Sequence, residues 1–410
     1  MRVESIGINE QPKIPSLLWL DLYKLTMGNL VFQEYPEVGA KYEFINRGKT
    51  LFPKGFGEKL RNQVDLMGNL RLTDREEPYL RKTCPYLSPE YIDWLKDFRL
   101  NPKEVEINQE EGDLSINVEG PWKSSIFWET HLMELICELY YEETGQQPDA
   151  DYILRAKEKG RRFKESGAKL LEFGTRRAYS TKVHRNVLEA LIQSAGVFGR
   201  DEGGVLLGTS NVALAMEFGL NPSGTFAHEW VMAHAGMFGI ENANRQALEV
   251  WAKHYEHFPK LMTALTDTYT TAAFLTDITP QLADKYRRYR QDSGNPFIEG
   301  ERLVAGINRW GFEPKTKEIV FSDNLNTDRA LQLQENFGPK IDPSFGIGTH
   351  LTNDVGVIPL NIVVKLHSIF INGREVGVAK LSDEPGKASG DPTAVIAARR
   401  YADSRATEYI

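Results

Sequence analysis

The sequence predicts an α/β protein in which a barrel of parallel strands and helices follows a smaller α+β region. Two observations support this prediction. Between residues 168 and 367 a short apolar run of strand type occurs eight times, and segments with helical periodicity lie between the runs. Before residue 126 the chain shows isolated strands and one hairpin, which is typical of an α+β arrangement.

The first region begins with a helical pattern at 14–35 around Asp21 and Lys24. Residues 40–47 alternate between apolar and polar side chains like a strand, and 104–120 indicates a hairpin that turns near Gly112. Apolar residues at helical spacing over 126–143 predict the helix that leads into the barrel.

Each of the eight apolar runs ends in glycine, small hydroxyl residues or charged residues. In α/β barrels the loops at the carboxyl ends of the strands build the catalytic face, so this pattern indicates an enzyme. Helical segments such as 184–195, 212–218, 242–254 and 328–336 separate the runs. The runs span residues 168–177, 204–211, 223–230, 261–268, 289–294, 319–324, 343–349 and 361–367.

The segment after the last run is rich in turn residues at 374–392 and basic at Lys380 and Lys387, and a helical pattern follows at 393–408. We expect these residues to return to the first domain. The predicted division is therefore an α+β domain of residues 1–125 plus about 372–410, and a barrel domain of residues 126–371.

Composition excludes several classes of protein. The 410 residues carry 49 Lys and Arg against 57 Asp and Glu, a net charge of -8 without a long basic run, so we expect no nucleic-acid partner. Cys84 and Cys137 are the two cysteines, which argues against a disulfide framework or a zinc site. Residues 1–15 show no apolar leader and no stretch reaches the length of a membrane span, so we expect a cytoplasmic protein without a membrane partner.

Three late runs carry candidate phosphate-binding residues. Gly346, Gly348 and Thr349 follow a predicted strand, and such a turn is either a phosphate cradle or a plain tight turn. Strand alternation places Arg290 and Asp292 on one face, where they form either a substrate-binding pair or a surface ion pair. Ser293 and Gly294 follow this pair, and Asp323 with Asn324 repeats the theme one strand later.

His228 ends the third run in a predicted strand tail. Most histidines in such positions are structural, but a neutral imidazole can act as a nucleophile or base if a carboxylate such as Asp267 orients its other nitrogen. Glu229 would point to the opposite side, toward solvent or a helix dipole. Phe173 is ordinarily the last core residue of its run, unless the substrate is a planar ring, in which case Arg176 can pair with a substrate carboxylate.

These phrases together resemble the nicotinate phosphoribosyltransferase family over nearly the whole chain. The matching motifs are LDLYKLTM at 20–27, LEFGTRR at 171–177, GTSN at 208–211, GTFAHEW at 224–230, DSG at 292–294, FSDNL at 321–325, FGIGTHLT at 345–352 and KLSDEPGK at 380–387.

The resemblance implies an irregular α/β barrel packed on an α+β domain, working as a homodimer with shared active sites. It also implies transfer of 5-phosphoribosyl from phosphoribosyl pyrophosphate to nicotinate in NAD salvage. Mg²⁺ and ATP are the implied cofactors, and ATP hydrolysis is coupled to the transfer through a phosphohistidine.

Site residues carried over from the family motifs fall into three groups. His228 would be the phosphorylated histidine, oriented by Asp267, and Asp292 would stabilise the charge that develops on the ribose. Phe173 and Tyr23 of the partner subunit would sandwich the pyridine ring, with Arg176 beside it. The implied phosphoribosyl and phosphate ligands are Arg47, Arg290, Ser293, Gly294, Asp323, Asn324, Gly346, Gly348, Thr349 and Lys387. The metal ligands stay unknown.

The choice between acid and amide depends on two positions. Amide-specific relatives have Asp where this chain has Ser210, and a hydroxyl can donate to the carboxylate of nicotinate while an aspartate would repel it. Asn295 favours the amide, because nicotinate enzymes commonly have Asp there. We give Ser210 more weight. A further departure is Trp19-Leu20 in place of Asp-Thr, which puts the cap of the first helix in question.

A different class of function is a silent relative that binds nucleotides or NAD precursors as a sensor. His228, Asp267, Arg290, Asp292 and the glycines at 346 and 348 are all retained, which argues against this alternative.

Overall fold

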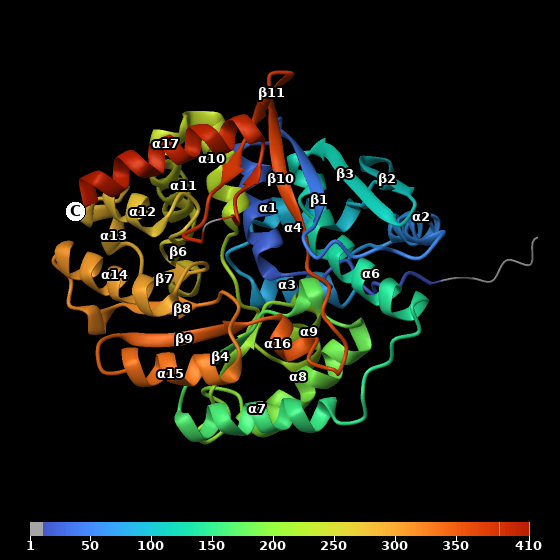
Figure 1. The fold of residues 1–410 in the computed structure, drawn as a ribbon, viewed down its shortest axis with the longest axis horizontal. Helices are drawn as coiled ribbons and strands as arrows, with labels where there is room; N and C mark the ends of the chain where they lie inside the picture. The colour runs from blue at the N-terminus through green and yellow to red at the C-terminus, as the bar shows by residue number, and fades with distance from the viewer. Residues whose placement is uncertain (1–10, 385, 410) are drawn as a thin grey trace, which may run out of the picture.

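A computed structural model describes residues 11–384 and 386–409. Two sheets organise these residues, one parallel and one antiparallel, and helix α1 (Leu22–Glu34) lies at the centre between them (Figure 1). The start of α1 is tied to the parallel sheet, because the Leu22 amide donates to the Ser210 carbonyl at 2.8 Å. The two halves of the molecule therefore meet where the first helix begins.

The parallel sheet has six strands in the order β5-β4-β9-β8-β7-β6. The edge strands β5 and β6 do not pair with each other, and residues 221–225 lie between them. Ser223 donates its amide to the Thr209 carbonyl of β5, and the Thr225 hydroxyl reaches the Thr263 carbonyl of β6. The predicted irregular barrel is confirmed. Its six parallel strands form one hydrogen-bonded sheet, and residues 221–225 lie between the two edge strands without forming a strand. The strands are β4 (Lys169–Glu172), β5 (Leu206–Thr209), β6 (Thr263–Leu265), β7 (Arg288–Gln291), β8 (Glu318–Phe321) and β9 (Asp342–Ile347).

Helices cover the outside of this ladder (Figure 1). Strand β8 is buried at every position, as expected when side chains pack on both faces of a parallel strand. The helical segments predicted between the runs are confirmed as α8, α9, α11 and α15. The helices of this region are α7 (Tyr152–Ser166), α8 (Thr181–Ala195), α9 (Val212–Phe218), α10 (His228–Phe238), α11 (Ile240–Tyr255), α12 (Thr271–Asp277), α13 (Pro280–Asp284), α14 (Pro296–Arg309), α15 (Thr327–Phe337) and α16 (Thr349–Thr352).

The antiparallel sheet has five strands in the order β11-β10-β1-β3-β2. The predicted hairpin is confirmed: β2 and β3 are joined by Glu111 and Gly112, which both have positive φ, as a tight hairpin turn requires. Its strands are β1 (Gly39–Asn46), β2 (Val105–Glu110), β3 (Asp113–Pro121), β10 (Ile362–Ile371) and β11 (Arg374–Gly377). The accompanying helices are α2 (Phe56–Met67), α3 (Glu76–Thr83), α4 (Pro89–Asp97), α5 (Trp122–Ser125) and α6 (Trp128–Glu143).

Three predictions about local structure were wrong. The eighth run forms β10, which pairs antiparallel with β1 and not with the barrel strands. The third run forms no strand over 223–227, and His228 begins α10 instead of ending a strand. The predicted helix over 14–35 begins only at Leu22, because Asp21 forms a β-bridge with Asn211. For the eighth run and for Asp21, a partner remote in sequence decided the local conformation.

The segment after β11 returns across the barrel. A two-stranded ribbon, β12 (Ala379–Lys380) and β13 (Ser389–Gly390), leads into α17 (Pro392–Tyr409), which packs on α12 (Figure 1). Tyr401 of α17 donates its hydroxyl to the carboxylate of Asp277 at 2.5 Å, and the side chain of Asp277 is buried. This contact anchors the tail on the barrel, while the division into two domains stays a prediction.

Cys84 and Cys137 are both buried and unpaired. Over residues 11–384 and 386–409, none of the helices has the length and apolar character that crossing a bilayer requires. The predicted absence of a leader over residues 1–15 falls mostly on residues 1–10, which lie outside the described part of the chain.

Candidate active site

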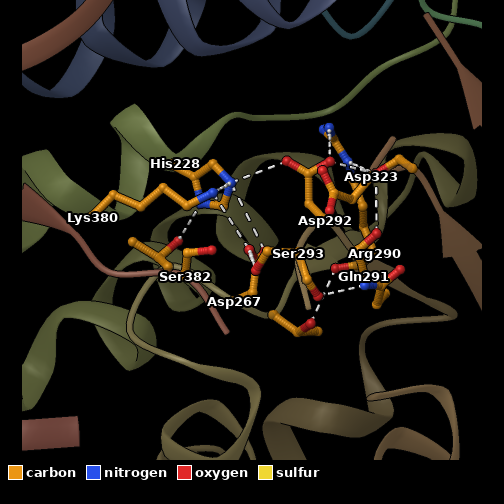
Figure 2. A network of polar contacts seen from close by, with 12 residues as sticks. His228, Asp267, Arg290, Gln291, Asp292, Ser293, Asp323, Lys380 and Ser382 are labelled. Carbon is orange, nitrogen blue, oxygen red and sulfur yellow. Dashed lines mark hydrogen bonds and ion pairs between the residues drawn. The ribbon is translucent and has the colours of Figure 1, made fainter. Parts of the chain in front are cut away.

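The loops after β6, β7 and β8 meet at one end of the parallel sheet, as predicted for a catalytic rim. His228 lies at this meeting point, close to Asp267 and Asp292 (Figure 2). Lys380 reaches the same point from β12, on the segment that crosses the barrel. Four segments that are remote in sequence therefore contribute titratable side chains to one small volume.

The imidazole of His228 is nearly buried and both of its nitrogens have partners. Nε2 lies 2.8 Å from Lys380 Nζ and 3.1 Å from Asp292 Oδ2, and Nδ1 lies 3.0 Å from Thr268 Oγ1. Burial, and secondly the positive charge of Lys380, lower the pKa of His228 to about 4. The ring is therefore neutral near pH 7. When the ring carries its proton on Nδ1, Nε2 accepts from the Lys380 ammonium, which can only donate; when the proton is on Nε2, that nitrogen donates to the Asp292 carboxylate.

The position of Asp267 differs from the predicted one. It was expected to hold the second nitrogen of His228, but its Oδ1 lies 3.9 Å from Nε2, and Thr268 occupies the Nδ1 side. The Asp267 carboxylate instead accepts a hydrogen bond from the Ser293 hydroxyl and lies 3.5 Å from Lys380 Nζ. That Asp267 orients His228 stays a prediction. In this structure such an effect would act through Lys380, which contacts both residues, and not through a direct hydrogen bond.

Arg290 and Asp292 face each other, as the strand alternation predicted. Arg290 Nη2 donates to Asp292 Oδ1 at 2.8 Å, and the hydroxyl of Ser322 joins both side chains. Each side chain is less than a fifth exposed, so the alternative of a solvated surface pair was wrong. Although burial acts to raise it, the pKa of Asp292 lies well below its usual range, because Arg290 and His228 stabilise the carboxylate. Asp292 is therefore a permanent negative charge beside the imidazole.

Ser293 and Gly294 continue this loop but serve its internal structure. The buried Ser293 hydroxyl donates to Asp267 and accepts from the Asp383 amide at 2.9 Å. Gly294 has a φ of 79°, and a Cβ there would lie 2.9 Å from the side chain of Asp383. Both residues thus hold the crossing segment against the rim, and their predicted contact with a phosphoribosyl group stays a prediction.

Asp323 and Lys387 form a second charged pair at the rim. Lys387 Nζ lies 3.2 Å from Asp323 Oδ2. Burial and the nearby charge of Asp292 raise the pKa of Asp323 to about 6. Burial lowers the pKa of Arg47, and the charges of Glu384 and Asp323 oppose that change, so Arg47 lies near this pair. Asn324 follows in a left-handed conformation with a φ of 45°, which turns the chain away after Asp323.

The glycines at 346 and 348 make room for Phe173. A Cβ on Gly346 would lie 2.5 Å from the ring of Phe173, and one on Gly348 would lie 2.9 Å from its carbonyl oxygen. The Phe173 ring is half-buried, and the guanidinium of Arg290 lies 5.7 Å from its centre. Thr349 begins the short helix α16 beyond these glycines. The turn at 346–349 therefore makes room for an aromatic ring at the rim. The spacing of its glycines in the sequence did not distinguish this function from phosphate binding.

Arg176, Tyr23 and Ser210 gather beside the start of α1. Arg176 Nε lies 3.5 Å from Asp21 Oδ2, and its guanidinium lies over the ring of Tyr23 at 5.8 Å. Burial raises the pKa of Asp21, while Arg176 and the hydroxyl of Ser210 oppose that rise. Tyr23 here neighbours Arg176 of its own chain, and its predicted contribution from a partner subunit stays a prediction.

The chain of contacts joins these groups into one site. His228 contacts Asp292, Asp292 binds Arg290, Arg290 lies over Phe173, and Phe173 packs on Gly346. Below Phe173 a cavity of about 420 Å³ extends between the strands. Leu171, Leu207 and Val320 line it, and Arg288 and Glu318 lie at its far end. These contacts link residues from α10 and from the ends of β7, β4 and β9, while a single pocket shared by all eight runs stays a prediction.

One group of side chains has the composition of a metal site. His228, Asp267 and Asp292 each offer a ligand atom, and these atoms lie within 4.8 Å of one another. Lys380 Nζ already supplies a positive charge at this point. Mg²⁺ prefers oxygen ligands, so the carboxylates, and not the imidazole, fit that ion.

Two functional candidates were missed by sequence reasoning and one was misjudged. Lys380 begins the KLSDEPGK motif, of which only Lys387 had been assigned a function, so the motif already held the signal. Thr268 directly follows Asp267, but nothing in its spacing marks it. Glu229 was expected to face solvent or a helix dipole, but it is buried and lies 2.6 Å from Lys24.

Two sequence departures have a structural explanation. Asn295 is exposed and caps α14 by accepting from the Phe297 amide, and Asn and Asp are equally good caps, so this position does not argue for the amide. The side chain of Asp21, at the cap of α1, makes no capping bond and faces Arg176 instead. Trp19 donates its indole N–H to the buried Glu134 at 2.7 Å.

Comparisons with known proteins cover nearly the whole chain. The nicotinate phosphoribosyltransferase (NAPRTase) family matches residues 168–404, and the N-terminal domain of that family matches residues 18–137. A nicotinate phosphoribosyltransferase of Chromohalobacter salexigens is 42% identical over 391 residues, which are 94% of this chain and 98% of that protein. One of Desulforapulum autotrophicum is 41% identical over 92% of this chain and 96% of that protein.

Solved structures agree in fold. The crystal structure of nicotinate phosphoribosyltransferase from Porphyromonas gingivalis superposes with a TM-score of 0.90 and 38% identity, covering 95% of this chain and 99% of that chain. A putative nicotinate phosphoribosyltransferase from Saccharomyces cerevisiae superposes with a TM-score of 0.89 and 33% identity, covering 96% and 99%.

Proposed function

The chain belongs to the nicotinate phosphoribosyltransferase family and has that activity, and from this premise we propose that it couples the transfer to ATP hydrolysis through a phosphohistidine at His228. The product is nicotinate mononucleotide for NAD salvage, and the second product is pyrophosphate. One observation carries the proposal: a neutral His228 places Nε2 between a cation, Lys380, and the permanently charged carboxylate of Asp292.

The phosphorylation step uses the lone pair of Nε2. A bond forms between Nε2 and the γ-phosphorus of ATP, the bond from that phosphorus to the bridging oxygen breaks, and ADP leaves. Nδ1 keeps its proton, which Thr268 accepts as a hydrogen bond. Lys380 then turns its ammonium from Nε2 to the new phosphoryl oxygens, where a charge-assisted bond is stronger. Hydrolysis of the phosphohistidine later returns the ring and releases phosphate.

The transfer step depends on placement and charge. The pyridine nitrogen bonds to the anomeric carbon of the ribose while the bond from that carbon to pyrophosphate breaks. Asp292 stabilises the positive charge that develops on the sugar, and Arg290 and Lys387 neutralise phosphate oxygens. The carboxylates of Asp292 and Asp323 would hold Mg²⁺, which would supply further neutralisation of the leaving group.

Recognition of the base uses aromatic and cationic side chains. Phe173 presents a half-buried ring at the rim, and Tyr23, carried on a second copy of the chain, completes the sandwich. Arg176 pairs with the carboxylate of nicotinate, and Ser210 donates to the same group, whereas an amide leaves the guanidinium without an anion. Because Tyr23 comes from a second copy, the proposal includes a homodimer with shared active sites. The proposed location of the enzyme is the cytoplasm.

The substrate and the coupling are tested by one set of assays. Product formation is measured with phosphoribosyl pyrophosphate and either nicotinate, nicotinamide or quinolinate, each with and without ATP. We expect efficient turnover of nicotinate alone, accelerated by ATP, with ADP formed. Equal use of nicotinamide contradicts the assignment of Arg176 and Ser210. Absence of product from all three bases favours the nucleotide-binding sensor.

A further inference from the structure

A second cluster of buried charges lies beside the active site and is not used by the reaction described above. We name it the Lys24 cluster; it consists of Lys24, Glu129, Glu229, Tyr42 and Trp122. Lys24 is fully buried in α1, and its Nζ lies 2.6 Å from Glu129 Oε2 and 2.6 Å from Glu229 Oε2. Burial alone lowers the pKa of a lysine, but the two carboxylates raise that of Lys24 above its usual value. The ammonium therefore stays charged between two anions.

The Glu229 end of the cluster fixes the start of α10. Glu229 directly follows His228, and its Oε1 accepts from the Tyr42 hydroxyl at 2.6 Å and from the Trp122 indole at 2.7 Å. With Lys24, three donors from α1, β1 and α5 hold this one carboxylate. The direction of the first turn of α10, and with it the position of the His228 ring, depends on these bonds.

The Glu129 end holds Arg176, which in the proposed function binds the nicotinate carboxylate, and Tyr23, which in the proposed dimer serves the site of the second copy. Glu129 Oε2 accepts from the Tyr23 hydroxyl at 3.3 Å, and Oε1 lies 3.4 Å from Lys365 Nζ and 3.6 Å from Arg176 Nη1. These contacts are longer than those around Glu229, and Arg176 is a quarter exposed. An anion that draws Arg176 toward itself therefore weakens its contact with Glu129 and leaves Lys24 as the main counter-ion of that carboxylate.

We propose that Lys24 is a positioning residue that couples occupation of the nicotinate site to the placement of His228. When the carboxylate of nicotinate takes Arg176, Glu129 binds Lys24 more strongly, and the altered Lys24–Glu229 contact shifts the first turn of α10. Coupling between two sites is reciprocal, so phosphorylation of His228 strengthens nicotinate binding by the same factor. This inference rests on the proposed ATP coupling, which it deepens by naming the connection between the two sites.

The test is the effect of ATP on nicotinate affinity in the wild type and in Lys24→Met. The dissociation constant of nicotinate is measured with and without ATP, together with ATP hydrolysed per product formed. In the wild type we expect ATP to tighten nicotinate binding by about tenfold. In Lys24→Met we expect that factor to fall below about twofold and the ATP used per product to rise severalfold.

Two further variants keep the test decisive. Lys317 is another nearly buried lysine, but it donates to the Ala283 and Tyr286 carbonyls at the far end of the barrel, so Lys317→Met should lose stability and keep the wild-type factor. If Lys24→Met fails to fold, Glu229→Gln removes one charge from the cluster with little change in shape, and should also reduce the factor. An unchanged factor in either cluster variant overturns the inference. A wild type that hydrolyses ATP during turnover but binds nicotinate equally well with and without ATP also overturns the inference, whereas a wild type that hydrolyses no ATP overturns the proposed ATP coupling itself.

Discussion

Two buried histidines lie at nearly the same distance from a carboxylate, and their surroundings differ. His184 Nε2 lies 3.0 Å from Glu172, and His228 Nε2 lies 3.1 Å from Asp292. His184 and Glu172 are both fully enclosed, whereas His228 has a cation, Lys380, at the same nitrogen as its carboxylate. Distance to a carboxylate therefore does not separate the enclosed His184 from His228, the proposed nucleophile; a cation at the same nitrogen and access to the rim do.

Glu172 shows what the enclosed pair is for. It accepts from the Thr209 hydroxyl at 2.5 Å and from the Gly174 amide, in addition to its contact with His184. Although burial acts to raise it, the pKa of Glu172 is lowered, because His184, Thr209 and Gly174 stabilise the carboxylate. This pair joins β4, β5 and α8 directly behind Phe173. It supports the backbone next to Phe173.

The largest expected effect comes from His228→Asn. Loss of the nucleophile should abolish the phosphoenzyme and lower the ATP-coupled rate by at least about a thousandfold. Phosphoenzyme is measured with ATP labelled in the γ-phosphate, and ADP release is measured alongside. His184→Asn is the matched control and should still form phosphoenzyme. Equal loss in both variants would abolish the distinction between the two histidines.

The second expected effect is on stability. His184→Leu leaves the charge of Glu172 buried without its partner, and loss of one member of a buried pair costs about 3 kcal/mol or more. The free energy of unfolding, measured with urea, should fall by that amount, whereas His228→Asn should change it by less than about 1 kcal/mol. A smaller loss for His184→Leu than for His228→Asn contradicts the structural assignment.

Lys380→Met should change the pH dependence of His228. Without Lys380 one cause of the low pKa is removed while Asp267 and Asp292 still raise it, so the pKa should move from about 4 toward the usual value of about 6.5. Phosphoenzyme formation needs the neutral ring, so its loss on acidification should begin at a higher pH in the variant. The rate of phosphoenzyme formation is measured between pH 5 and pH 8. The same decrease on acidification in both proteins would show that Lys380 does not affect the titration of His228.

The same titration has a consequence for stability. The folded-state pKa of His228 lies below that of the unfolded chain, so the unfolded chain binds the proton first. The folded state therefore loses stability as the pH falls from about 6.5 to about 4. Lys380→Met should show less of this loss, which unfolding measurements across that range can detect.

The smallest expected effect comes from Thr268→Val. This change keeps the shape of the side chain but removes the acceptor at Nδ1 of His228, and a single neutral hydrogen bond contributes about 1 kcal/mol. The rate of phosphoenzyme formation should fall about fivefold, with nicotinate affinity measured without ATP unchanged. A rate equal to that of the wild type would show that phosphoenzyme formation does not need the Nδ1 contact of His228.

The sequence by itself determined the alternation of strands and helices, the hairpin near Gly112, and the set of rim residues that includes His228, Arg290 and Asp292. These features are local: side-chain periodicity of two or 3.6 and the chemistry of turns are written in neighbouring residues. Arg290 and Asp292 could be paired in advance because they are two residues apart on one strand.

Tertiary structure alone decided which remote groups meet. Lys380 contacts His228 across 152 positions, and Lys24 contacts Glu229 across 205. Tertiary structure also decided the partner of β10. Its sequence has the pattern of a barrel strand, but the strand pairs with β1. A strand or a charged side chain has the same local sequence pattern whatever its partner is. Only packing brings the partner into contact. The hydrogen bonds and charges of a buried group must be satisfied wherever the fold places that group.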